Sequence, residues 1–103
     1  MNALDTLLTM VFPRSLEEEL IDHLLEHPEW VRGFTISQVE GKGEVVRLSG
    51  IAEEVRGRAR RVQVQTVLNG GDARALIEHL KRSLPNPEVA YWLSPVLDFG
   101  RFA

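Results

Sequence analysis

The sequence predicts an α+β domain in which strands and helices follow the order strand, helix, strand, strand, helix, strand. Two amphipathic helical patterns are each closed by a proline, and four short segments are rich in apolar, β-branched or aromatic residues. The chain has 103 residues, of which 44% are hydrophobic, and this is enough for one buried core. We therefore expect residues 1–103 to form a single domain.

The first strand and the first helix are predicted within the first 28 residues. Residues 4–12 are mostly apolar and are followed by Pro13, which is typical of a buried strand. Ser15 and Glu18 have the spacing of a capping box, so we expect the helix to begin at Ser15 and to end before Pro28. Its apolar face consists of Leu16, Leu20, Ile21, Leu24 and Leu25.

A long excursion is predicted between the second and third strands. Residues 33–39 and 59–68 alternate in polarity, as half-buried strands do. The third strand has Val62, Val64 and Leu68 on one face and Arg61, Gln63 and Gln65 on the other. Between about residues 40 and 60 glycines interrupt the pattern, which leaves room for only a short strand and a helical turn. A loop of this length in a small domain is typical of a functional segment.

The second helix and the last strand complete the domain. Asp72 is the expected N-cap, and a second amphipathic pattern runs to Pro85. Residues 88–93 predict the fourth strand, and two phenylalanines in the tail suit docking on a neighbouring surface. The resulting βαββαβ order is that of the ferredoxin-like fold, a four-stranded antiparallel sheet with two helices on one face. Its uncovered face favours self-association.

The charge distribution narrows the possible partners. Residues 1–41 carry eight acidic and two basic side chains, whereas residues 42–61 carry six basic and three acidic ones. Because the net charge is -3 and the basic charge is confined to one segment, we do not expect a nucleic-acid partner. The absence of cysteine excludes disulfides and a thiol nucleophile. No apolar segment predicts a secretion signal or membrane insertion, so we expect a cytoplasmic protein.

The arginines at the end of the excursion are the first candidate site. Arg56, Arg58, Arg60 and Arg61 could bind a small anionic ligand, because guanidinium groups form paired hydrogen bonds to phosphate or carboxylate. Gly41 and Gly43 could add backbone amides to this ligand-binding site. The alternative is a solvated start of a strand, whose arginines pair with Glu53, Glu54 or the acidic first helix of an adjacent subunit. Both interpretations remain open.

Two histidines are the second candidate site. His23 and His27 are four residues apart on the first helix, a spacing that can place two imidazoles around a metal ion, with Glu19 or Glu26 as a further ligand. The alternative is that the helix dipole favours histidines near a C-terminus without any metal. We expect His79 to be an exposed or half-buried side chain. No catalytic triad or pair of carboxylates is evident, so we do not expect an enzyme.

Three stretches resemble one known family. GFTISQVEGKG at residues 33–43 resembles the second strand and the beginning of the T-loop in PII signalling proteins, and SGIAEEV at residues 49–55 resembles the far side of that loop. YWLSPVLDFGRF at the end of the chain resembles a branch of small PII-like proteins often encoded beside heavy-metal efflux systems. The related CutA proteins are the nearest alternative.

The resemblance implies a homotrimer with ligand sites in the clefts between subunits, at the base of the T-loop. Such proteins bind a small molecule and then change their contact with a partner protein, which for this branch could be a membrane transporter of heavy metals. The CutA alternative implies a divalent-metal-binding tolerance protein, in which His23 and His27 would hold the ion. A third alternative is an oligomeric interaction module without a ligand. Tyr91, the single tyrosine, belongs to a predicted strand, so tyrosine modification in the loop is not expected.

Overall fold

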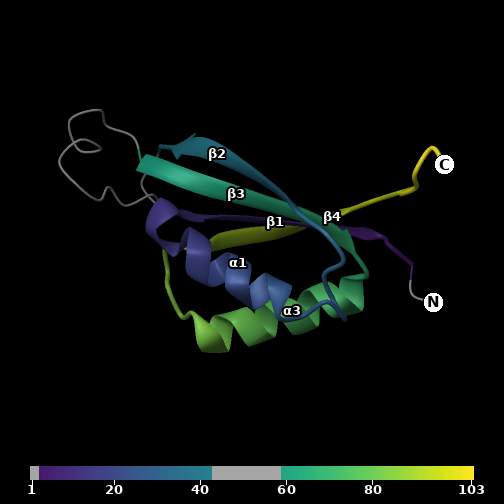
Figure 1. Ribbon diagram of the computed structural model, residues 1–103, viewed down its shortest axis with the longest axis horizontal. Coiled ribbons are helices and arrows are strands. Elements are labelled where there is room, and N and C mark those ends of the chain that lie inside the picture. Colours follow the sequence, from purple (N-terminus) through teal and green to yellow (C-terminus); the bar gives the residue numbers. More distant parts are fainter. Residues whose placement is uncertain (1–2, 43–58) are drawn as a thin grey trace.

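The computed structural model describes residues 3–42 and 59–103. The described elements occur in the predicted order (Figure 1): β1 (Thr6–Pro13), a 3-10 turn (Arg14–Leu16), α1 (Glu17–Leu25), β2 (Thr35–Gly41), β3 (Ala59–Leu68), α3 (Gly70–Ser83) and β4 (Ala90–Pro95). This confirms the βαββαβ prediction. The short strand and the helical turn predicted within the excursion lie outside the described residues.

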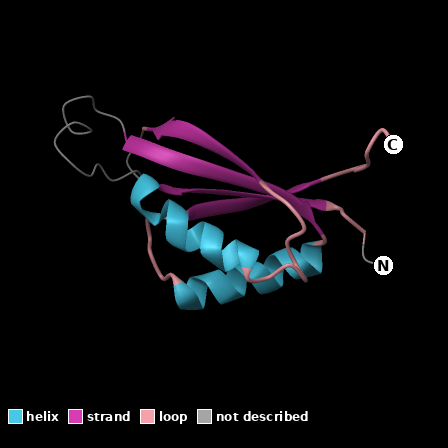
Figure 2. Cartoon of the chain, in the orientation of Figure 1, coloured by secondary structure: helices cyan, strands magenta, loops and turns pink. Residues whose placement is uncertain are grey.

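The sheet is antiparallel, with the strand order β2-β3-β1-β4. The two longest strands are central, and their register runs from Thr6 opposite Leu68 to Pro13 opposite Arg61. Both helices cover the same face of this sheet (Figure 2). The other face carries no helix from the described residues, and it is called the open face below.

The core lies between the sheet and the helices. Alternate residues of β1 and β3 point toward the helices, as the period of two requires. Leu8, Phe12, Val62 and Val64 are completely buried there, and Leu20 and Leu24 of α1 meet them from the other side. Burial of each such side chain stabilises the fold by about 1.5–3 kcal/mol. The predicted division of β3 into two faces is thus confirmed.

Both predicted N-caps are wrong. Ser15 lies inside the 3-10 turn, which follows β1 directly, so α1 begins after Leu16 without a side-chain cap. The second helix begins two residues before Asp72. Its N-cap is Asn69, whose backbone is extended and whose side chain accepts a 2.9 Å hydrogen bond from the Gly71 amide. Asp72 instead lies in the first turn, where its charge favours the helix dipole.

Three strands begin two residues later than predicted, and β1 begins at Thr6 rather than at residue 4. For β2 and β4, hydrogen bonds hold the preceding residues outside the ladder. The Gly33 carbonyl accepts a 2.6 Å hydrogen bond from the Thr66 hydroxyl, and β2 begins at Thr35. Before β4, the Glu88 amide donates to Asn86 Oδ1 and the Val89 amide donates to the Asn86 carbonyl. Because of this turn, β4 begins at Ala90.

The open face mixes polar and apolar side chains. Gln65 donates a 3.2 Å hydrogen bond to Thr9, its cross-strand neighbour, and Trp92 lies opposite Thr9 on the other side. Trp92 is nearly half exposed. In the tail, Leu97 and Phe102 are fully exposed and Phe99 is nearly half exposed, so the docking of the two phenylalanines on a neighbouring surface stays a prediction. None of the helices in residues 3–42 and 59–103 is long and apolar enough to cross a membrane.

Candidate functional site

The excursion leaves and rejoins the sheet at one end. Gly41, the last residue of β2, pairs with Ala59, the first residue of β3, and Glu40 pairs with Arg60. The connection from α3 to β4 lies at the same end of the molecule (Figure 1). We call this region, comprising residues 40–42, 59–61 and 84–89, the loop base. Of the predicted ligand-binding residues, it contains Gly41, Arg60 and Arg61, whereas Gly43, Arg56 and Arg58 lie outside the described residues.

Arg61 is the buried cation of the loop base. Only 3% of the residue is exposed, its Nη1 donates a 3.1 Å hydrogen bond to the Arg60 carbonyl, and its Nη2 lies 3.5 Å from Glu88 Oε2. A buried charge requires such compensation, because its desolvation is costly. Arg61 is therefore not the solvated side chain that one interpretation of the sequence expected. It ties the start of β3 to the α3–β4 connection.

Glu88 is not among the site residues predicted from the sequence, although it is central to the geometry of the loop base. The Asn86 side chain accepts a 2.8 Å hydrogen bond from the Glu88 amide, which is the hydrogen-bonding pattern of an Asx-turn. This turn fixes the backbone that carries the Glu88 carboxylate. Asn86 and Pro87 are residue types that indicate a turn in the sequence. Arg61 and Glu88 are 27 residues apart in the chain, so the sequence alone does not predict the contact between their side chains.

The remaining cations of the loop base are accessible. Arg60 and Lys42 are exposed; Arg60 lies near the start of β3, and Lys42 directly follows the end of β2. Guanidinium and ammonium groups on adjacent strand ends can bind phosphate or carboxylate oxygens. Glu88 and Glu40 at the same end can accept hydrogen bonds. The described part of the loop base thus contains side chains of the types that contact anionic groups and hydrogen-bond donors.

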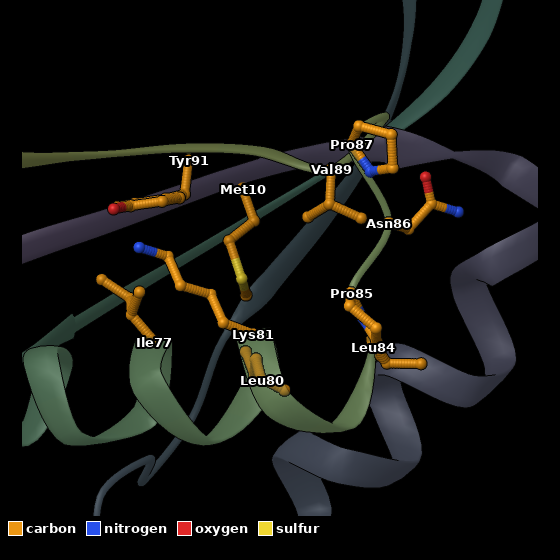
Figure 3. Close-up of a pocket in the computed structure, with 10 residues that line it drawn as sticks. All are labelled: Met10, Ile77, Leu80, Lys81, Leu84, Pro85, Asn86, Pro87, Val89 and Tyr91. Atoms are coloured by element: carbon orange, nitrogen blue, oxygen red, sulfur yellow. The ribbon is translucent and has the colours of Figure 1, made fainter.

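A pocket of about 410 Å³ lies between α3 and β4, and residues 84–87 and 89 of the loop base form part of its lining (Figure 3). Its walls are mainly apolar and come from Met10, Ile77, Leu80, Leu84 and Val89, while Lys81 and Tyr91 lie at one side. The Lys81 ammonium lies 5.1 Å from the centre of the Tyr91 ring. A hydrogen bond to Tyr91 raises the pKa of Lys81 above its ordinary value, because it stabilises the charged form.

The structure pairs the histidines differently from the sequence hypothesis. His27 meets His79 of α3, and their Nε2 atoms are 3.1 Å apart. His23 also lies beside His79, with ring centroids 5.8 Å apart. In the described ranges, no three or more histidine or acidic side chains are arranged to hold a metal ion. His79, predicted only as a half-buried or exposed side chain, is half-buried, and its contact with His27 is not predicted by helical spacing.

Comparison with known proteins assigns the family. The profile of a family described as "Protein of unknown function (DUF3240)" matches residues 2–103. The chain belongs to the DUF3240 family. Among curated proteins, none matches it. A crystal structure of a DUF3240 family protein from Shewanella baltica OS155 is 17% identical, with a TM-score of 0.77 over 98% of this chain and 99% of that one.

The fold of this DUF3240 protein is PII-like. CPII from Thiomonas intermedia K12, a nitrogen regulatory PII-like protein, is 16% identical over 94% of this chain and 93% of its own, with a TM-score of 0.70. That CPII structure is bound to ADP, AMP and bicarbonate. A protein from Thermus thermophilus, described as PII-like and signalling, is 19% identical over 89% and 85% of the two chains, with a TM-score of 0.64. These likenesses confirm the predicted fold.

Proposed function

We propose that this protein is a non-catalytic, PII-like regulator that binds a small anionic ligand at the loop base and thereby changes its contact with a partner protein. The observation that carries the proposal is the position of Arg61. Its contact with Glu88 joins the strand on which the excursion returns to the α3–β4 connection. A ligand bound at this junction would touch both segments and bias the conformation of the loop base.

The ligand proposed is an adenine nucleotide. CPII, which shares the fold, is bound to ADP, AMP and bicarbonate. In this chain, the exposed side chains of Arg60 and Lys42 supply charges suited to phosphate oxygens. Arg56, Arg58 and the backbone of Gly43 belong to the same proposed site.

The proposed assembly is a homotrimer. The open face carries the exposed ring of Trp92 beside Thr9 and Gln65, a mixture that packing against a second copy would bury. Each loop base would then lie at a cleft between two subunits, where a neighbouring chain could complete the site. The proposed partner protein is a membrane transporter of a heavy-metal efflux system, which the excursion would contact.

Isothermal titration with ATP, ADP, AMP and bicarbonate, in the presence of EDTA, tests this proposal. We expect heat from at least one nucleotide. Because Arg60 supplies a charge-assisted contact, Arg60→Ala should weaken binding about tenfold, and Arg58→Ala should have a similar effect. Arg74→Ala is the matched control, because Arg74 is an exposed arginine of α3, far from the loop base.

Two results would contradict the proposal. Equal losses in Arg60→Ala and Arg74→Ala would mean that the loop base is not the site. The absence of heat with all four compounds would instead favour an interaction module without a ligand. Circular dichroism of each variant establishes that the fold is retained.

A further inference from the structure

Two imidazoles from distant parts of the chain face each other on the helical side of the molecule. His27 follows the end of α1, and His79 lies in the second half of α3. Their Nε2 atoms are 3.1 Å apart, and the two rings are inclined by 68°. Two nitrogens at this distance must share one proton, because two facing N–H groups would repel each other. One of the two nitrogens therefore presents a lone pair to the other.

Glu29 orients the His27 ring. Its carboxylate lies 2.7 Å from His27 Nδ1, so this nitrogen must carry the proton and donate it to the carboxylate. Nε2 is then the nitrogen available as a ligand. A carboxylate that receives the second ring N–H is the usual outer partner of a metal-binding histidine, since it fixes the ring and makes it more basic.

The separation of the two nitrogens fits a shared metal ion. Imidazole nitrogens bind divalent transition metals at about 2.0–2.1 Å. Two such bonds with their nitrogens 3.1 Å apart enclose an angle of about 100° at the metal, between the values of square-planar and tetrahedral sites. An ion could take the place of the shared proton with only small movements of the two rings.

The surroundings also favour a cation. Asp22 in the last turn of α1 and Glu26 at its C-cap are the acidic residues of this helix that lie nearest to His27 in the chain, whereas Glu17, Glu18 and Glu19 lie in its first turn. Nδ1 of His23 is buried, and it makes no hydrogen bond within residues 3–42 and 59–103. A buried polar atom of this kind requires an explanation, and a water bound to an ion beside it would be a suitable partner.

We propose that His27 and His79 bind one divalent transition-metal ion, Cu²⁺, Ni²⁺ or Zn²⁺, through their Nε2 atoms, with water as the remaining ligands. His23 is not assigned as a ligand, because no group of three candidate ligands is assembled in the described ranges. The proposal does not depend on nucleotide binding, since neither histidine belongs to the loop base. Imidazole ligands favour these metals, and Cu²⁺ is expected to bind most tightly of the three.

Trp30 provides a specific readout of this site. Its ring stacks on His27, with centroids 4.8 Å apart and an angle of 16° between the planes. The chain has only one other tryptophan, Trp92 on β4, so the variant Trp92→Phe leaves Trp30 as the sole indole. In this background, CuCl₂ and NiCl₂ should quench the fluorescence saturably, with a stoichiometry of one ion per chain. MgCl₂ should have no effect.

Four substitutions test the ligands in the same background. His27→Ala and His79→Ala should each weaken Cu²⁺ binding at least about thirtyfold, whereas His23→Ala should change it less than about threefold. Glu29→Gln, at an exposed side chain, should weaken it about tenfold while leaving the packing intact. The last variant keeps the test decisive if an alanine variant does not fold.

Several results would contradict the proposed metal site. Unchanged quenching in His79→Ala or in Glu29→Gln would overturn the proposal, as would the absence of saturable quenching in the background protein. A loss in His23→Ala equal to that in His27→Ala would overturn the assignment of two ligands. As a second measurement, Zn²⁺ at about a hundredfold excess over its Kd should raise Tm in the background protein but not in His79→Ala.

Discussion

At the residue scale, each candidate site depends on a contact between side chains that are far apart in the chain, Arg61 with Glu88 and His27 with His79. The cluster of arginines and the histidine pair could be read from residue type and spacing. The burial of Arg61 and its contact with Glu88 could not, because both depend on the turn at Asn86 and on the register of β3. Likewise, helical spacing grouped His23 with His27, whereas the packing of α1 on α3 brings His27 to His79.

The Lys81–Tyr91 contact gives a prediction for one pKa. The hydrogen bond to Tyr91 raises the pKa of Lys81, so Tyr91→Phe should lower it toward its ordinary value. A raised lysine pKa stabilises the folded state below the ordinary value, and this contribution is lost as the pH rises through the folded-state pKa. The chain has only two lysines, so NMR of the side-chain nitrogens can follow Lys81, with Lys42 as an internal reference.

The substitution Tyr91→Phe separates two causes of the raised Lys81 pKa, the tyrosine hydroxyl and the aromatic ring. Tyr91→Phe removes the hydroxyl but keeps a ring beside the ammonium, which lies 5.1 Å from the ring centre. An unchanged Lys81 pKa in this variant would mean that the ring, rather than the hydroxyl, stabilises the charge.

At the element scale, the types and order of the elements could be predicted because hydrophobic periodicity reflects burial directly. β3 was predicted with its observed bounds, Ala59–Leu68. The ends of other elements were less predictable, since single hydrogen bonds decide them. Serine is a favoured N-cap residue, but Ser15 lies inside a 3-10 helix that begins at the preceding residue. In NGGD, two residues could cap the helix, and the extended backbone of Asn69 decides between them.

The capping role of Asn69 gives a prediction for stability. Asn69→Ala removes the hydrogen bond to the Gly71 amide and the 3.0 Å bond that the side chain donates to the Ala3 carbonyl. We expect the free energy of unfolding to fall by about 1 kcal/mol, measured by urea denaturation at a fixed protein concentration. Asp72→Ala is the matched control, and its effect should be smaller because only a dipole interaction is lost. A larger loss in Asp72→Ala would refute the assignment.

At the scale of the whole molecule, the sheet has one face buried by both helices and one face left open (Figure 2). The sequence indicated this division, because two helices can cover only one side of four strands. The sites follow from the same layout. The loop base forms where the excursion leaves the edge of β2 and rejoins at β3, and the His27–His79 contact forms where the two helices lie together on the covered face.

The open face makes the oligomeric state testable by one substitution. Sedimentation equilibrium should give three times the 11.6 kDa mass of one chain. Trp92→Glu should shift the protein toward monomers, because a carboxylate would be buried without a partner in the proposed interface. Ile36→Glu is the matched control, because Ile36 is similarly exposed but its cross-strand neighbour Val64 places it on the helix-covered side. A monomeric parent protein, or equal dissociation by both variants, would exclude the open face as the trimer interface and would remove the intersubunit cleft from the proposed ligand site.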